Sequence, residues 1–70
     1  MPLSYNKLWK LLIDRGITKQ DLIKATGISP NTMTRLNKGL EVKMGILMKI
    51  CSYLHVDIGD IVEYREEENL

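Results

Sequence analysis

The stretch KQDLIKATGISPNTMTRLNK, residues 19–38, contains two short helical segments separated by a glycine. Thr18, followed three residues later by Asp21, resembles a capping box at the start of the first segment. Gly27 tolerates a positive φ and ends that segment, and Ser29 is a strong N-cap for the second. Apolar side chains are spaced so that they meet across the bend, namely those of Leu22, Met33 and Leu36. The stretch therefore predicts a helix-turn-helix.

The second segment has two faces of different chemistry. It begins with Pro30, where a missing amide hydrogen costs nothing, and Met33, Leu36 and Leu40 fall on one side. The opposite side carries hydrogen-bonding residues only, which are Asn31, Thr34, Arg35 and Lys38. Asparagine can bond adenine, arginine can bond guanine, and the major groove admits one helix. A polar face is also the ordinary appearance of a solvated helix, but the adjoining bend favours contact with bases.

Further helices are expected on both sides of this motif. Apolar residues recur at helical spacing over residues 4–16, with Ser4 as a plausible N-cap. A fourth periodic segment covers residues 44–54. Asp57 then resembles the cap of a short fifth helix that includes Ile58, Ile61 and Val62.

The chain is expected to form one all-α domain of five helices. It has 70 residues, of which 44% are hydrophobic and 27% charged, close to the averages of globular proteins. No segment shows the strict alternation of a half-buried strand, so no strand is expected. We place the domain at residues 1–65 and a frayed acidic tail at residues 66–70.

Three features favour a cytoplasmic protein with no membrane partner. The longest apolar run, Met44 to Met48, has five residues, whereas a membrane span needs about 20. The N-terminal residues lack the apolar segment of a secretory signal. Cys51 is the single cysteine and cannot form an internal disulfide.

The charges are unevenly distributed along the chain. Lys and Arg exceed Asp and Glu by six in residues 1–49, whereas Asp and Glu exceed Lys and Arg by five in residues 50–70. A basic body with an acidic end is typical of proteins that contact nucleic acid, although a solvated tail gives the same count.

Several short segments of the sequence match the motifs of a known family, with the same spacing between them. They are ITKQDL at residues 17–22, TGISPNTMTRLNKG at 26–39, LMKICSYL at 47–54 and DIGDI at 57–61. Through them the sequence resembles the Xre-like family of phage-repressor and Cro-type helix-turn-helix regulators. The resemblance implies a five-helix, lambda-repressor-like fold that binds double-stranded operator DNA. It also implies a homodimer with one recognition helix per half-site of an inverted repeat.

The resemblance assigns DNA contacts to individual residues. Asn31, Thr34 and Arg35 correspond to the base-reading residues. Contacts with phosphate are expected from residues at the ends of the helices, namely Lys19, Gln20, Ser29, Thr32, Lys38 and Lys43. The chain departs from the family at Lys19, where glutamine is common, and at Ile23, where a small residue is favoured.

Two other groups of polar residues have spacings that occur in metal or catalytic sites. Cys51 and His55 lie four residues apart on one predicted helix, but no further Cys or His completes a site. The spacing of Asp57, Asp60 and Glu63 is explained by helix capping. We therefore expect no enzymatic activity, no metal, no cofactor and no small-molecule substrate.

Large apolar side chains divide into expected core and expected surface. Met33, Met44 and Met48 have core-like periodicity. Trp9 lies off the apolar stripe of its helix and is expected to be partly exposed to a partner. Two tyrosines near the acidic end are further candidates for a dimer surface, namely Tyr53 and Tyr64.

The favoured function is a sequence-specific DNA-binding regulator of transcription, acting as a repressor, with the second helix of the motif in the major groove. The alternative is a protein-interaction module on the same scaffold, such as an antitoxin or anti-repressor. DNA binding by the first would weaken steeply between about 50 and 200 mM salt, whereas the second would show no salt-dependent DNA binding.

Overall fold

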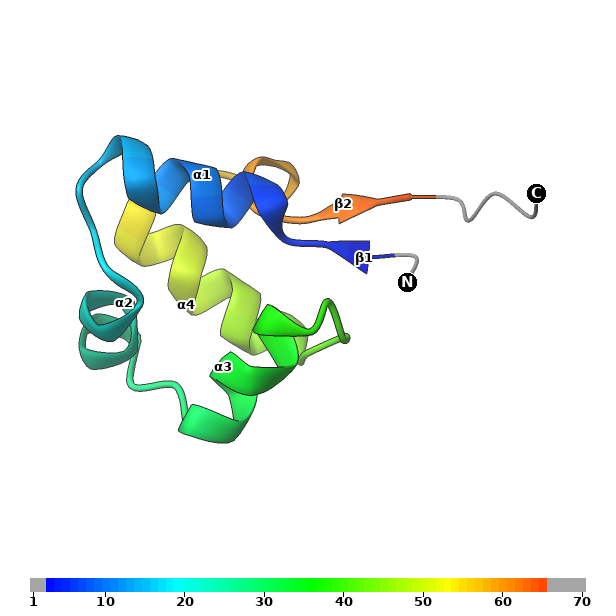
Figure 1. Ribbon diagram of the computed structural model, residues 1–70, viewed down its shortest axis with the longest axis horizontal. Coiled ribbons are helices and arrows are strands. Elements are labelled where there is room, and N and C mark those ends of the chain that lie inside the picture. Colours follow the sequence, from blue (N-terminus) through cyan, green and yellow to red (C-terminus); the bar gives the residue numbers. More distant parts are fainter. Residues whose placement is uncertain (1–2, 66–70) are drawn as a thin grey trace.

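Residues 3–65, which the computed structural model describes, form four α-helices, one 3₁₀ turn and a two-stranded sheet (Figure 1). The helices are α1 (Asn6–Asp14), α2 (Lys19–Thr26), α3 (Pro30–Asn37) and α4 (Met44–Leu54). The strands are β1 (Leu3–Ser4) and β2 (Glu63–Tyr64), and the 3₁₀ turn is Ile58–Asp60. None of the helices in this part of the chain is long and apolar enough to cross a bilayer. The tail expected at residues 66–70 lies outside the described residues.

Local capping sets the beginnings of α2 and α3, as predicted. Thr18 Oγ1 accepts from the Asp21 amide, and Asp21 Oδ2 accepts from the Thr18 amide, both at 3.0 Å. Ser29 Oγ accepts from the Thr32 amide at 3.1 Å. Gly27 has φ 70° and ψ 17°, a left-handed conformation that bends the chain between the two helices. The predicted helix-turn-helix is confirmed.

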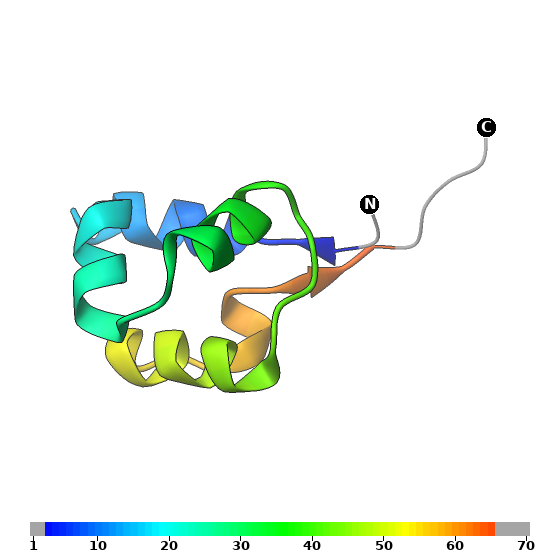
Figure 2. The same ribbon diagram turned by 90° about the horizontal axis from the view of Figure 1, so that it is seen from below.

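Within residues 3–65, one core of eleven buried hydrophobic side chains joins the four helices. In Figure 2, α1 and α4 lie on opposite sides of the molecule, and α2 connects the two sides at one end. The three residues predicted to meet across the bend are all in this core. Its members are Tyr5, Leu8, Leu12, Leu22, Ile28, Met33, Leu36, Leu47, Ile50, Leu54 and Ile61. Removal of these side chains from water is the main force that holds α3 at a fixed angle to α2.

The start of α1 differs from the prediction. Ser4 lies in β1, and the helix begins at Asn6 after Tyr5. Tyr5 is 2% exposed, and its hydroxyl donates to the carbonyl of Leu40 at 3.0 Å. Burial of Tyr5 and pairing of β1 therefore decide where the helix starts, while Ser4 Oγ accepts from the Asn6 amide at 3.3 Å.

The expectations of a fifth helix and of no strand are wrong. The Asp57 amide donates to Asp60 Oδ2 at 3.0 Å, as a cap would, but the helical conformation lasts for one 3₁₀ turn. Ile61 is fully buried, and the chain beyond it extends along β1 as an antiparallel strand. Strands of two residues are too short to show alternation. The paired residues are Leu3 with Tyr64 and Ser4 with Glu63.

The methionines of α4 also differ from the prediction. Met33 is buried as expected, but Met44 and Met48 are 58% and 61% exposed. Apolar residues cover more than one face of α4, so periodicity alone did not show which face is buried. The face in the core consists of Leu47, Ile50 and Leu54.

Candidate nucleic-acid interface

α3 presents one apolar face to the core and one polar face to solvent. Met33 and Leu36 are 6% and 1% exposed and hold the helix in place. Asn31, Thr34 and Arg35 are exposed on the opposite face of α3, and Lys38, which is also exposed, is the C-cap residue directly after the helix. The structure therefore brings the three expected base-reading residues together.

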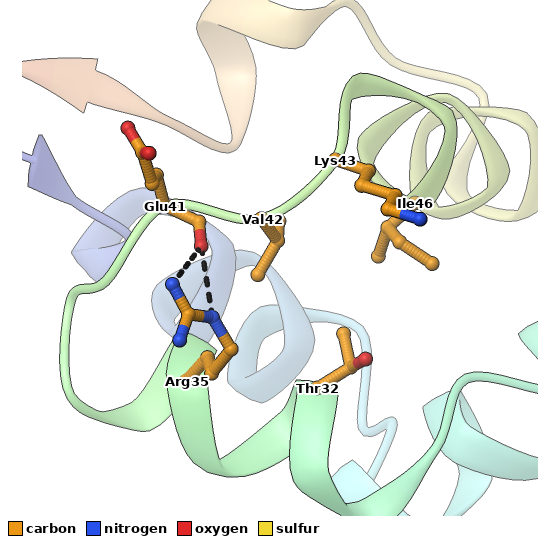
Figure 3. A pocket seen from close by; sticks show the side chains of 6 residues that line it. All are labelled: Thr32, Arg35, Glu41, Val42, Lys43 and Ile46. Carbon is orange, nitrogen blue, oxygen red and sulfur yellow. Dashed lines mark hydrogen bonds between the residues drawn. The ribbon is translucent and has the colours of Figure 1, made fainter.

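The guanidinium of Arg35 is held by the loop that joins α3 to α4 (Figure 3). Nε and Nη2 donate to the carbonyl oxygen of Glu41 at 3.0 and 2.9 Å. These two nitrogens form the side edge of the guanidinium. The end edge, formed by Nη1 and Nη2, still carries a hydrogen on each nitrogen. Arg35 is thus oriented by the protein while it keeps a pair of donors for another acceptor.

Arg35 lies beside an open hollow between α3 and α4 (Figure 3). Thr32 and Lys43, two of the expected phosphate contacts, line the same hollow as Arg35. α4 begins here with no side-chain cap and no acidic residue in its first turn, so its partial positive charge is not neutralised within the helix. The complete lining is Thr32, Arg35, Glu41, Val42, Lys43 and Ile46.

Hydroxyl groups at the start of α3 already have partners within the helix. Ser29 Oγ, besides capping the helix, lies 3.0 Å from Thr32 Oγ1. Thr34 Oγ1 donates to the carbonyl of Pro30 at 3.0 Å. Because the hydroxyl hydrogen of Thr34 is used in this way, the group can meet a base through its methyl or as an acceptor.

Lys19 is held between α1 and α3. Its Nζ lies 4.2 Å from the centroid of the Trp9 ring and donates to Asn37 Oδ1 at 2.7 Å. Trp9 is half-buried, as expected. Its contact with Lys19, and the contact of Lys19 with Asn37, were not predicted. The three residues belong to three different helices, so no spacing in the sequence signals their contact.

Basic side chains therefore surround the polar face of α3. Lys19 lies on the side of α1, Lys43 lies across the hollow on the side of α4, and Lys38 follows the last turn of α3. All three are exposed, as is Gln20 in the first turn of α2. Glu41 is the only acidic residue that lines the hollow among residues 3–65, and its carboxylate is directed away from Arg35, whereas its carbonyl oxygen faces the guanidinium (Figure 3). This distribution favours a negatively charged ligand.

Cys51 and His55 do not form part of this interface. Cys51 is half-buried, and its burial, followed by the nearby carboxylates of Asp57 and Asp60, raises the pKa of the thiol. His55 ends α4 in a left-handed conformation with φ 58°. Within the described residues, no three His, Cys, Asp or Glu side chains are grouped as metal ligands would be.

Comparison with known proteins identifies the family. The model of the Cro/C1-type HTH DNA-binding domain matches residues 7–67. The chain belongs to this family. It also resembles the crystal structure of the transcriptional regulator VanUg, with a TM-score of 0.91 and 48% sequence identity, over 94% of this chain and 88% of that one. A search of curated proteins gave no match.

Family membership confirms the resemblance predicted from the sequence. The matched residues of the Cro/C1-type domain include the whole helix-turn-helix, all of α4 and the 3₁₀ turn. The chain is therefore a helix-turn-helix protein of a DNA-binding family.

Proposed function

We propose that the chain is a sequence-specific regulator of transcription that inserts α3 into the major groove of operator DNA. The observation that carries the proposal is the outer face of α3, where Asn31, Thr34 and Arg35 are exposed on a helix whose other face is fixed in the core. Asparagine can bond adenine N6 and N7, and a threonine methyl can pack against thymine. The name of the similar structure, a transcriptional regulator, supports the same function.

Arg35 is the residue to which we assign the strongest discrimination between bases. Guanine presents O6 and N7 in the major groove, and a guanidinium bonds both through two parallel N–H groups. The Glu41 carbonyl occupies the side edge of Arg35 and leaves the end edge available. Arg35 can therefore bond guanine without losing its contact with the loop, which reduces the entropy lost on binding.

The ends of the helices are assigned to the phosphate backbone. The residues are Lys19, Gln20, Ser29, Thr32, Lys38 and Lys43. Such contacts fix the register of the protein on the duplex but carry no sequence information. Each phosphate neutralised by a lysine contributes roughly −0.9 to the slope of log affinity against log salt concentration.

We further propose a homodimer on an inverted repeat, in which occupancy of the operator represses transcription. One module of this kind buries only about 600–1,000 Å² on DNA, which is small for specific binding. α4 offers Met44 and Met48, one helical turn apart, as an exposed apolar surface. Two copies with antiparallel α4 helices would remove these methionines from water.

Selection from random duplex DNA, followed by sizing of the complex, tests the proposal. We expect an inverted-repeat motif with half-sites about one helical turn apart and two chains per duplex. We also expect affinity to fall by roughly 10³-fold or more between 50 and 200 mM salt if six or more phosphates are contacted. Failure to select any motif, together with affinity that is independent of salt, would contradict the proposal and favour the protein-interaction alternative.

A further inference from the structure

We infer that Trp9 and Asn37 position Lys19 for a DNA phosphate, so that the junction of α1, α2 and α3 is a preformed phosphate contact. The inference rests on the proposed function, because it assigns two further residues to the same interface. Lys19 Nζ lies 4.2 Å from the centroid of the Trp9 ring and 2.7 Å from Asn37 Oδ1. The ammonium group is thus held from two directions by helices other than its own.

Both partners of Lys19 are neutral. A carboxylate in either place would compete with phosphate for the ammonium group, whereas a ring face and an amide oxygen leave its positive charge uncompensated. The ammonium has three N–H donors, and Asn37 accepts from one of them. Donors therefore remain for a phosphate oxygen on the solvent side.

Positioning matters because a lysine side chain is flexible. An unsupported lysine loses part of its rotamer freedom when it binds phosphate. The ring of Trp9 and the amide of Asn37 order Lys19 before DNA arrives, so less entropy remains to be lost.

The surroundings of the cluster place it on the DNA-binding side. Trp9 and Asn37 line a hollow together with Lys38, a second residue assigned to phosphate. Arg35 and Lys43 line a different hollow, between α3 and α4. Basic residues therefore lie on two sides of α3. A helix in the major groove has one DNA strand on each side, so the two basic surfaces can each face the phosphates of one strand.

A double-mutant cycle measured on the selected operator tests the inference. Lys19→Met is expected to reduce the salt slope by about 0.9, and Lys24→Met, a matched change on α2, to leave the slope unchanged. Trp9→Leu and Asn37→Ala are each expected to weaken binding about two- to fivefold when Lys19 is present, and to have no further effect in the Lys19→Met chain. Trp9→Phe, which keeps a ring face, should retain most of the affinity.

Two outcomes of the cycle would overturn the inference while leaving DNA binding intact. One is an equal loss of affinity from Trp9→Leu in both backgrounds, which would mean that Trp9 acts only through the fold. The other is an unchanged salt slope for Lys19→Met. Failure of the proposed function would differ from both, because the unaltered chain would then select no operator.

Trp9 fluorescence provides a second measurement that needs no change at Trp9. It is the single tryptophan of the chain, so its emission can be assigned without ambiguity. Addition of operator is expected to change the emission of the unaltered chain, and to change it less in the Lys19→Met chain. The same emission change in both chains would contradict the inference.

Discussion

Arg35 combines two properties that a base-reading side chain needs, a fixed position and free donors. Its place on the outer face of α3 follows from helical periodicity and could be predicted from the sequence. Its contact with the Glu41 carbonyl could not, because that contact depends on the conformation of the loop between α3 and α4. The same holds for Lys19, whose position in the sequence marks a phosphate contact but does not reveal Trp9 or Asn37 as its partners.

Tyr5 stabilises the loop that holds Arg35. Its hydroxyl donates to the carbonyl of Leu40, the residue before Glu41. Burial, followed by the charge of Glu41, raises the pKa of Tyr5 above its ordinary value of 10.0, and the charge of Arg35 partly opposes this shift. Because the pKa is higher in the folded protein, folding favours the neutral phenol. The stability that this phenol contributes is complete at neutral pH and is lost as pH rises through the pKa of the folded protein.

Tyr5→Phe is therefore expected to lower the free energy of unfolding by about 1 kcal/mol at neutral pH, because the Leu40 carbonyl loses its donor. Urea denaturation measures the difference. Tyr64→Phe is the matched control, since Tyr64 is 71% exposed, and should leave the free energy of unfolding unchanged. Equal stability of the Tyr5→Phe and unaltered chains would show that the hydroxyl does not hold the loop.

Among the elements, those with strong local signals were predicted well. α2 and α3 have capping side chains at their starts and a left-handed glycine between them, and both helices begin at the predicted residues. The start of α1, the buried face of α4 and the short 3₁₀ turn depend on contacts between distant segments. β1 and β2 pair residues that are far apart in the sequence, and no local sequence pattern indicates this pairing.

The capping box of α2 is expected to make the free energy of unfolding depend on pH in the acid range. Hydrogen bonds from the amide and then the hydroxyl of Thr18 lower the pKa of Asp21. A lowered folded pKa means that this stabilisation is present above the unfolded pKa of about 3.9 and is lost as pH falls through the folded value. Asp21→Asn should therefore be less stable than the unaltered chain at pH 7, with a difference that disappears in strong acid.

Chemical denaturation across this pH range measures the difference. Thr18→Ala, which removes the N-cap hydroxyl, should cost about 1 kcal/mol at pH 7. An Asp21→Asn chain with the same stability difference at every pH would contradict the assignment of this pH dependence to Asp21.

At the scale of the whole molecule, the fold separates the surface for DNA from the surface proposed for a second copy. Basic residues gather around α3, and the exposed methionines lie on α4. Met48→Glu is expected to leave the free energy of unfolding unchanged, because Met48 is 61% exposed, but to weaken the dimer. Affinity for the full inverted repeat should then fall, while affinity for a single half-site should stay the same.

Sedimentation of the protein and binding to both duplexes check this prediction. Ile13→Glu is the control, since Ile13 is 78% exposed on α1, and it should change neither dimerisation nor DNA binding. A Met48→Glu chain that still forms dimers would exclude α4 as the contact between copies.

The central claim is that the outer face of α3 distinguishes bases while the residues around it hold phosphate. The most direct measurement compares Arg35→Ala with Lys38→Ala on the selected operator and on random DNA of equal length. Arg35→Ala should weaken operator binding by about 1–3 kcal/mol and random DNA much less, with relaxed preference at one base pair. Lys38→Ala should weaken both duplexes alike and reduce the salt slope by about one. Equal losses for both variants on both duplexes would contradict the claim.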